Sequence, residues 1–204
     1  MVGCSLMLLT HDPSTAATEL AAGVLSCPSQ GCSGRLGPWG HARQRVLRLG
    51  SGQSEAHTPR RARCRRCGGT HVIVPARSYP RRPDTAEVVG TALVAGASGL
   101  GHRRVAELVE LPATTVRGWL RRARANSEAV RVDATVAVHA LDPNAAPLAP
   151  TGSALGDMLD AVGAALAAAV RRFGPVPAPW QLAVVITGGA ILALRPQPAW
   201  HGSG

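Results

Sequence analysis

Two close pairs of cysteines constrain the fold of this chain more than any other feature of its sequence. One pair has four residues between its cysteines and the other has two; the four residues are Cys27, Cys32, Cys64 and Cys67. Zinc takes four such ligands in a tetrahedron, and each pair of ligands usually sits on a tight turn. Gly68 and Gly69 follow the second pair and favour a turn there. The pattern predicts a structural Zn2+ site that folds residues 27–75 into a small antiparallel, zinc-ribbon-like β unit.

The interval within the first pair, and the 31 residues between the pairs, are longer than in most zinc ribbons. The extra length falls largely in the loop over residues 50–59, where an insertion costs little free energy. The alternative is that the cysteines are small core residues without a metal. Cys4 stands outside both pairs and is expected to pack. Three histidines could each replace a cysteine: His41, His57 and His71. Of these, His71 lies in a strand-like run, which favours a surface or structural role.

The net charge of +10 is concentrated in the middle of the chain. Residues 35–124 contain 18 arginines and five acidic residues, a net charge of +13, whereas residues 1–34 carry −2 and residues 125–204 carry −1. A positive segment between nearly neutral ends indicates a surface that binds a polyanion. The guanidinium fork suits phosphate or guanine, each through two hydrogen bonds. The alternative is a solvated arginine-rich face.

Residues 84–126 are predicted to form a three-helix unit with a helix-turn-helix. The helices are expected from Asp84, over His102–Val109 and from Ala113 to Ala125 or beyond, with Asp84 and Glu87 as a start signal for the first. Glu110 stands at the turn, where it would need a left-handed backbone. The buried face of the second and third helices is expected to contain Val105, Val109, Leu111, Val116 and Trp119.

The exposed side of the same two helices holds the residues predicted to bind DNA. In a helix-turn-helix the second helix enters the major groove, and its N-terminal residues meet the base edges. Base contacts are expected from Thr114, Thr115 and Arg117. Phosphate contacts are expected from Arg103, Arg104, Arg121 and Arg122, each of which could alternatively be a solvated surface residue.

The two ends of the chain give weaker patterns. Residues 1–26 are expected to be an apolar N-terminal segment with a short helix over Ser14–Ala22. Residues 127–152 are predicted to be a linker, and residues 153–195 a C-terminal helical region that begins with an amphipathic helix over Ser153–Phe173. That helix could close a homodimer or pack on its own domain. The fold class is therefore expected to be α+β.

No membrane segment is expected. The longest apolar run, Leu182–Leu194, has 13 residues, and a spanning helix needs about 20. Met1–Thr10 lacks the basic start of a secretory signal. These features predict a cytoplasmic protein, in which thiols stay reduced and paired cysteines favour a metal over a disulfide.

Three segments, CPSQGCSGRLGPWGHAR, RRARCRRCGGTHVIVPA and GHRRVAELVELPATTVRGWLRRARA, together resemble a family of bacterial proteins. Members have an N-terminal zinc-ribbon-like part and a transposase-type helix-turn-helix, and they are similar to the DNA-binding front ends of insertion-sequence transposases. The resemblance covers roughly residues 20–125. It implies DNA binding, in a transcription regulator or a protein linked to a mobile element, and no catalytic domain.

Together these observations predict a non-enzymatic protein that binds double-stranded DNA sequence-specifically and takes no small-molecule substrate. The acidic residues after Ala125 show no convincing three-carboxylate metal site for strand transfer; they are Glu128, Asp133, Asp142, Asp157 and Asp160. One alternative is an RNA-binding or protein-interaction ribbon whose helices serve assembly. Another is a catalytic subunit fragment that needs a second chain.

Overall fold

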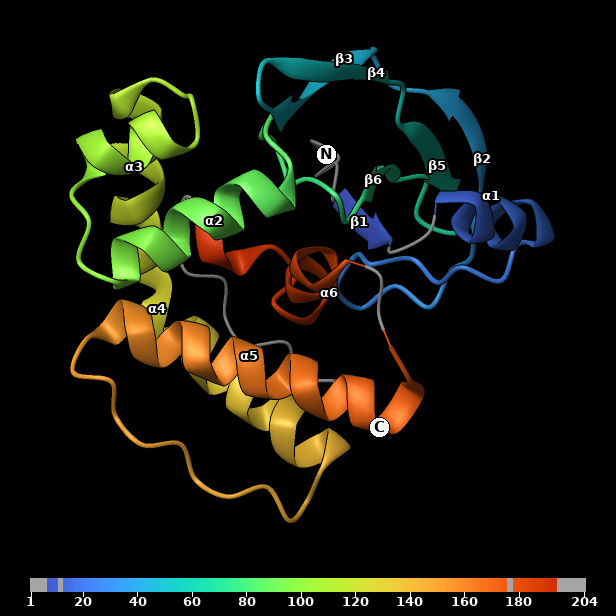
Figure 1. Ribbon diagram of the computed structural model, residues 1–204. Coiled ribbons are helices and arrows are strands. Elements are labelled where there is room, and N and C mark those ends of the chain that lie inside the picture. The colour runs from blue at the N-terminus through green and yellow to red at the C-terminus, as the bar shows by residue number, and fades with distance from the viewer. Residues whose placement is uncertain (1–6, 11–12, 176–177, 194–204) are drawn as a thin grey trace.

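The computed structural model describes residues 7–10, 13–175 and 178–193. The protein is α+β, with two small sheets at one end and most of the helices at the other (Figure 1). One sheet has four strands in the order β1-β6-β5-β2, and the other is the hairpin β3–β4. The strands are β1 (Met7–Thr10), β2 (Leu36–His41), β3 (Arg45–Gly50), β4 (Gln53–His57), β5 (Arg60–Cys64) and β6 (Thr70–Pro75).

The four-stranded sheet combines antiparallel and parallel pairs. β2, β5 and β6 are antiparallel neighbours, whereas β1 pairs with β6 in parallel, with Met7 opposite Val72. The N-terminal segment therefore adds a strand to the sheet of the cysteine-containing unit. Helix α1 (Pro13–Ala22), which was predicted, ends at Gly23 with φ of +70°. It covers one face of the sheet, and the core between them contains Ala16, Leu20, Leu36, Ala62 and Ile73.

The hairpin β3–β4 has a shorter turn than the sequence suggested. Residues 50–59 were expected to be a loop, but β4 lies within them: Leu47 pairs with Glu55 and Arg48 with Ser54. Ser51 and Gly52 make the turn with φ of 49° and 69°. Two consecutive left-handed residues match the twist of a tight hairpin, so the strands continue almost to the turn.

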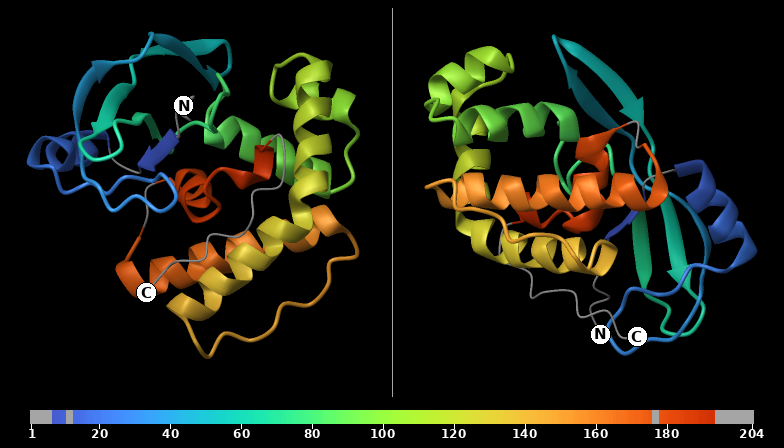
Figure 2. Two further views of the ribbon diagram at one scale, coloured as in Figure 1. Left: turned by 180° about the vertical axis from the view of Figure 1, so that it is seen from behind. Right: turned by 60° about the horizontal axis from the view of Figure 1, so that its bottom comes forward.

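The remaining helices share a second, larger core. They are α2 (Ala86–Ala97), α3 (His102–Leu108), α4 (Ala113–Leu141), α5 (Ala154–Phe173), α6 (Pro179–Ile186) and the short 3-10 helix η1 (Ala190–Leu192). Residues from every one of them meet in this core, including Val89, Leu93, Val105, Trp119, Leu120, Met158, Val184 and Ile191. Helices α4 and α5 run side by side in the same direction, so that Arg171 near the end of α5 donates to Asp142 just after the end of α4 at 2.9 Å (Figures 1 and 2).

The expectation of a linker over residues 127–152 needs correction. Helix α4 continues through 29 residues to Leu141, so only residues 142–153 connect it to α5. Asn126 and Ser127 lie in this helix and are buried. The side-chain amide of Asn126 donates to the carbonyl oxygens of Ala190, Ile191 and Ala193 at 3.0, 3.2 and 3.1 Å. These bonds satisfy a buried amide and hold the C-terminal turn against the middle of α4.

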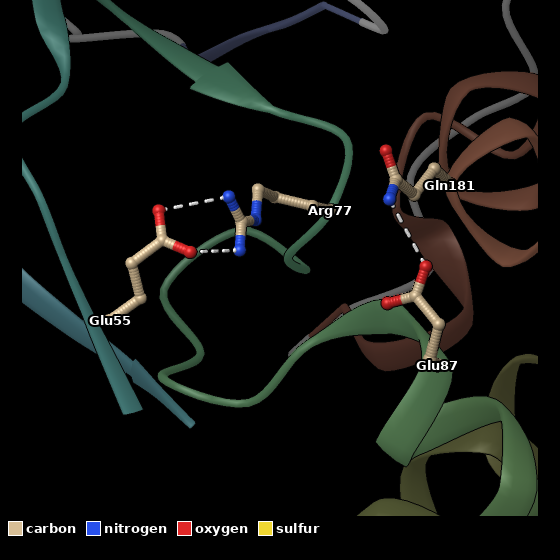
Figure 3. A network of polar contacts seen from close by, with 4 residues as sticks. All are labelled: Glu55, Arg77, Glu87 and Gln181. Carbon is tan, nitrogen blue, oxygen red and sulfur yellow. Dashed lines mark hydrogen bonds and ion pairs between the residues drawn. The ribbon is translucent and has the colours of Figure 1, made fainter. Parts of the chain in front are cut away.

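The start of α2 also differs from expectation. Its N-cap is Thr85, which makes no side-chain capping bond, and the predicted pair of acidic residues serves other partners. The buried carboxylate of Asp84 accepts hydrogen bonds from Arg48 of β3 at 2.7 and 3.0 Å. Glu87 accepts one from the side chain of Gln181 in α6 at 3.1 Å (Figure 3). The two acidic residues thus connect α2 to its neighbours.

No helix in the described ranges is long and apolar enough to cross a membrane.

Candidate metal centre and nucleic-acid interface

The four predicted ligands come together in one cluster. The Sγ atoms of Cys27, Cys32, Cys64 and Cys67 all lie within 4.8 Å of one another. The Sγ atoms of Cys27 and Cys67 are 3.8 Å apart, and those of Cys32 and Cys64 are 3.7 Å apart. A tetrahedron with Zn–S bonds of about 2.3 Å has S···S edges of roughly 3.8 Å. A disulfide would need an S–S distance of about 2.05 Å. The four thiols are therefore spaced as ligands of one metal ion.

Backbone turns place the thiols, and at Cys64 they also stabilise the anionic form, whereas the pKa of Cys32 is raised to about 11. The N–H groups of Arg66 and Cys67 donate to Sγ of Cys64 at 3.4 and 3.5 Å, and the N–H of Gly34 donates to Sγ of Cys32 at 3.4 Å. The hydrogen bonds from the backbone of Cys67 and then of Arg66 lower the pKa of Cys64 to about 6. Because the thiolate is the form that binds metal, this turn prepares Cys64 as a ligand.

Glycine is required at position 34, a signal that the sequence analysis did not use. A Cβ atom there would lie 2.5 Å from Sγ of Cys64 and 2.7 Å from Cβ of Arg66. Cβ atoms essentially never approach other heavy atoms so closely. Gly34 thus lets the chain after the first cysteine pair pass directly beside the second.

His71 lies next to the cluster, fully buried, with Nε2 3.6 Å from Sγ of Cys27. The prediction of a surface position for His71 is wrong, whereas a structural role agrees with its burial. His41, on β2, is exposed. His57, in β4, is partly buried, and this burial lowers its pKa. Cys4 lies outside the described residues.

Helices α3 and α4 form the predicted buried face. Val105, Val109, Val116 and Trp119 are buried, and Leu111 is partly buried against the same core. The chain turns between the helices at Glu110, whose φ is +54°, the left-handed conformation that the sequence required. This turn brings the start of α4 across α3.

Five of the seven residues predicted to bind DNA are exposed on this helix pair. Thr114, Arg117 and Arg121 are exposed along one face of α4. Arg103 and Arg104 are exposed on α3. Two of the seven are half-buried, Thr115 and Arg122. Arg124, which the sequence analysis did not single out, extends the exposed face by one turn.

Arg82, in the connector before α2, is half-buried. Burial lowers the pKa of Arg82, and so does the nearby charge of Arg122. The Nε atom of Arg82 is buried and has no hydrogen-bond partner among the residues that the structure describes. The carboxylate of Asp84 acts in the opposite direction and raises the pKa of Arg82.

Comparisons of the chain with protein-family models, curated proteins and solved structures found no match.

Proposed function

We propose that this protein binds double-stranded DNA sequence-specifically, without catalysis, as a transcription regulator or an accessory protein related to transposases. In this proposal α3 and α4 are a helix-turn-helix. The four cysteines hold a structural Zn2+ ion that stabilises the four-stranded sheet. A site with four thiolate ligands has no open position for a catalytic water, which suits a structural role.

The observation that carries the proposal is the left-handed turn at Glu110 between two helices that bury a common face. It leaves Thr114, Arg117 and Arg121 exposed in the first turns of α4, where a recognition helix meets base edges. Arg103 and Arg104 lie on the preceding helix, where phosphate contacts are common.

A homodimer through the C-terminal helix belongs to the same proposal. Leu155 and Val162 of α5 are buried within their own chain, but at the end of the helix Val170 and Phe173 are 37% and 75% exposed. These two side chains are the part of the predicted apolar stripe that a second copy would cover. A dimer would present two recognition helices to a pseudo-palindromic site.

The test is selection of bound sequences from a random pool of duplex DNA, followed by affinity measurements on the enriched motif. We expect Arg117→Ala to weaken binding to that motif about 10-fold or more, with a much smaller loss on random duplex, because a base contact carries about 1–3 kcal/mol of discrimination. Arg172→Ala, an exposed arginine of α5, is the matched control and should leave both affinities unchanged.

Two results would count against this function. Equal losses for Arg117→Ala on the motif and on random duplex would contradict base reading. Failure to enrich any duplex motif, with an affinity that hardly depends on salt, would favour a protein-interaction module, because phosphate contacts make affinity fall steeply with salt.

A further inference from the structure

The outer face of strands β2 and β5 differs from the face that packs against α1. Side chains alternate across a strand, so every second residue shares a face. Ala62 and Cys64 of β5 are buried in the sheet core. Arg61 and Arg63 alternate with them and point to the other side, and Arg65 continues this row just beyond the strand. Arg63 and Arg65 are exposed, and Arg61 is half-buried.

An exposed tryptophan lies beside this row of arginines. Gly37 of β2 pairs with Arg63 of β5, which places Gly37 and Trp39 on the arginine side of the sheet. Trp39 is 49% exposed, and the guanidinium carbon of Arg63 lies 4.6 Å from the centre of its ring. We call Trp39, Arg61, Arg63 and Arg65 the basic strand face.

The basic strand face carries a positive charge that the ion pairs of the described residues do not neutralise. None of its arginines forms an ion pair with another described residue. Glu55 is the single acidic residue between positions 24 and 83 of the sequence, and it is held by Arg77. A surface with three arginines and no acid is complementary to phosphate groups.

We propose that the basic strand face binds single-stranded DNA, with an unpaired base stacked on Trp39 and phosphates bound by Arg61 and Arg65. Proteins that bind single strands combine a positive surface along the backbone with aromatic rings on which bases stack. A duplex hides the faces of its bases, so a half-exposed tryptophan among arginines fits an unpaired base better. The choice of DNA over RNA rests on the proposed function, because α3 and α4 would hold duplex DNA on the same chain.

The experiment measures binding of the full chain to a labelled oligothymidine of about 16 nucleotides. We expect Trp39→Ala to weaken binding about 5- to 100-fold, and Trp39→Phe, which keeps an aromatic ring, to weaken it much less. Arg65→Ala should reduce the slope of log affinity against log salt by about 0.7. Arg45→Ala, an exposed arginine of the separate hairpin, is the control for general charge and should have a smaller effect. Circular dichroism and metal content verify that each variant is folded.

Unchanged affinity in Trp39→Ala would overturn the proposal, and so would an equal loss on duplex DNA. Tighter binding of an oligouridine RNA than of oligothymidine would overturn the choice of DNA. Failure of the proposed function would be seen in separate measurements. No duplex motif would be enriched, and Arg117→Ala would not change the affinity for duplex DNA. If oligothymidine binding depends on Trp39 but no duplex motif is enriched, single-strand binding by the basic strand face is supported and the helix-turn-helix function is contradicted.

Discussion

Arg48 and Asp84 connect the hairpin to the first helix of the larger core. The Asp84 side chain is 1% exposed, and that of Arg48 is 40% exposed. The backbone supports the same contact, because the N–H of Arg48 donates to the carbonyl of Pro83 at 2.6 Å and the N–H of Thr85 donates to the carbonyl of Arg48 at 3.1 Å. A buried carboxylate depends on its hydrogen bonds, since water cannot replace them.

We expect Asp84→Ala to lower the free energy of unfolding by about 2 kcal/mol, because it removes two charged hydrogen bonds and leaves a guanidinium partly buried without its partner. Urea unfolding measures the change. Glu55→Ala is the matched control, since Glu55 also accepts two hydrogen bonds from one arginine, Arg77, but is 46% exposed (Figure 3). Its effect should be small. A similar loss in both variants would show that burial does not set the strength of these pairs.

The Glu55 pair should also respond to acid. The hydrogen bond from Arg77 lowers the pKa of Glu55 below its usual value. Its small stabilisation is therefore present at neutral pH and is lost as the pH falls through the lowered pKa. The difference in the free energy of unfolding between wild type and Glu55→Gln should therefore disappear once the pH is below the lowered pKa of Glu55.

At the residue scale, the sequence predicted that the four cysteines lie together, because ligand spacing is a local pattern. The four cysteines form the expected cluster. The buried position of His71 and the close approach at Gly34 could not be predicted, because both depend on contacts with residues more than 25 positions away. The prediction that Asp84 marks the start of a helix was wrong for the same reason, since the arginine that binds its carboxylate lies in the hairpin.

At the element scale, α4 combines two different environments in one helix. Its first half was predicted from hydrophobic spacing, which Val116 and Trp119 follow. Its second half was not, because Asn126 and Ser127 are polar and are buried only through bonds to carbonyl oxygens. Strand β1 was missed as well, since a parallel partner 65 residues away leaves no local pattern. Periodicity therefore predicts elements that bury apolar faces, and fails where polar or distant backbone contacts decide.

The turn between α3 and α4 gives a test at this scale. Glu110 has φ of +54°, a conformation that costs an L residue about 1 kcal/mol and glycine little. We expect Glu110→Gly to raise the free energy of unfolding by up to about 1 kcal/mol. Ala125→Gly, an exposed position in the middle of α4, should lower it by about 1 kcal/mol, because glycine disfavours a helix interior. Thermal unfolding compares the two, and destabilisation by both would contradict the role of the left-handed turn.

At the scale of the whole molecule, the two cores differ in what holds them together. The core of the four-stranded sheet is small, and two of its members are the ligand candidates Cys27 and Cys64. The helical core is larger and contains no cysteine. A structural zinc contributes on the order of 10–16 kcal/mol in small zinc domains, enough to decide whether a core of this size folds. The helical core has no such requirement.

Metal removal should therefore affect the two parts unequally. We expect a chelator to abolish hydrogen-exchange protection of the amides in β5 and β6, while those in the middle of α4 and α5 keep theirs, because the helical core buries its own apolar surface. Added zinc should restore protection, and Cys64→Ser should behave like the chelated protein even with zinc present. Equal loss of protection in the sheet and the helices would mean that the molecule unfolds as one cooperative unit. Full protection of β5 and β6 without metal would show that the thiol cluster packs as apolar side chains and needs no ion.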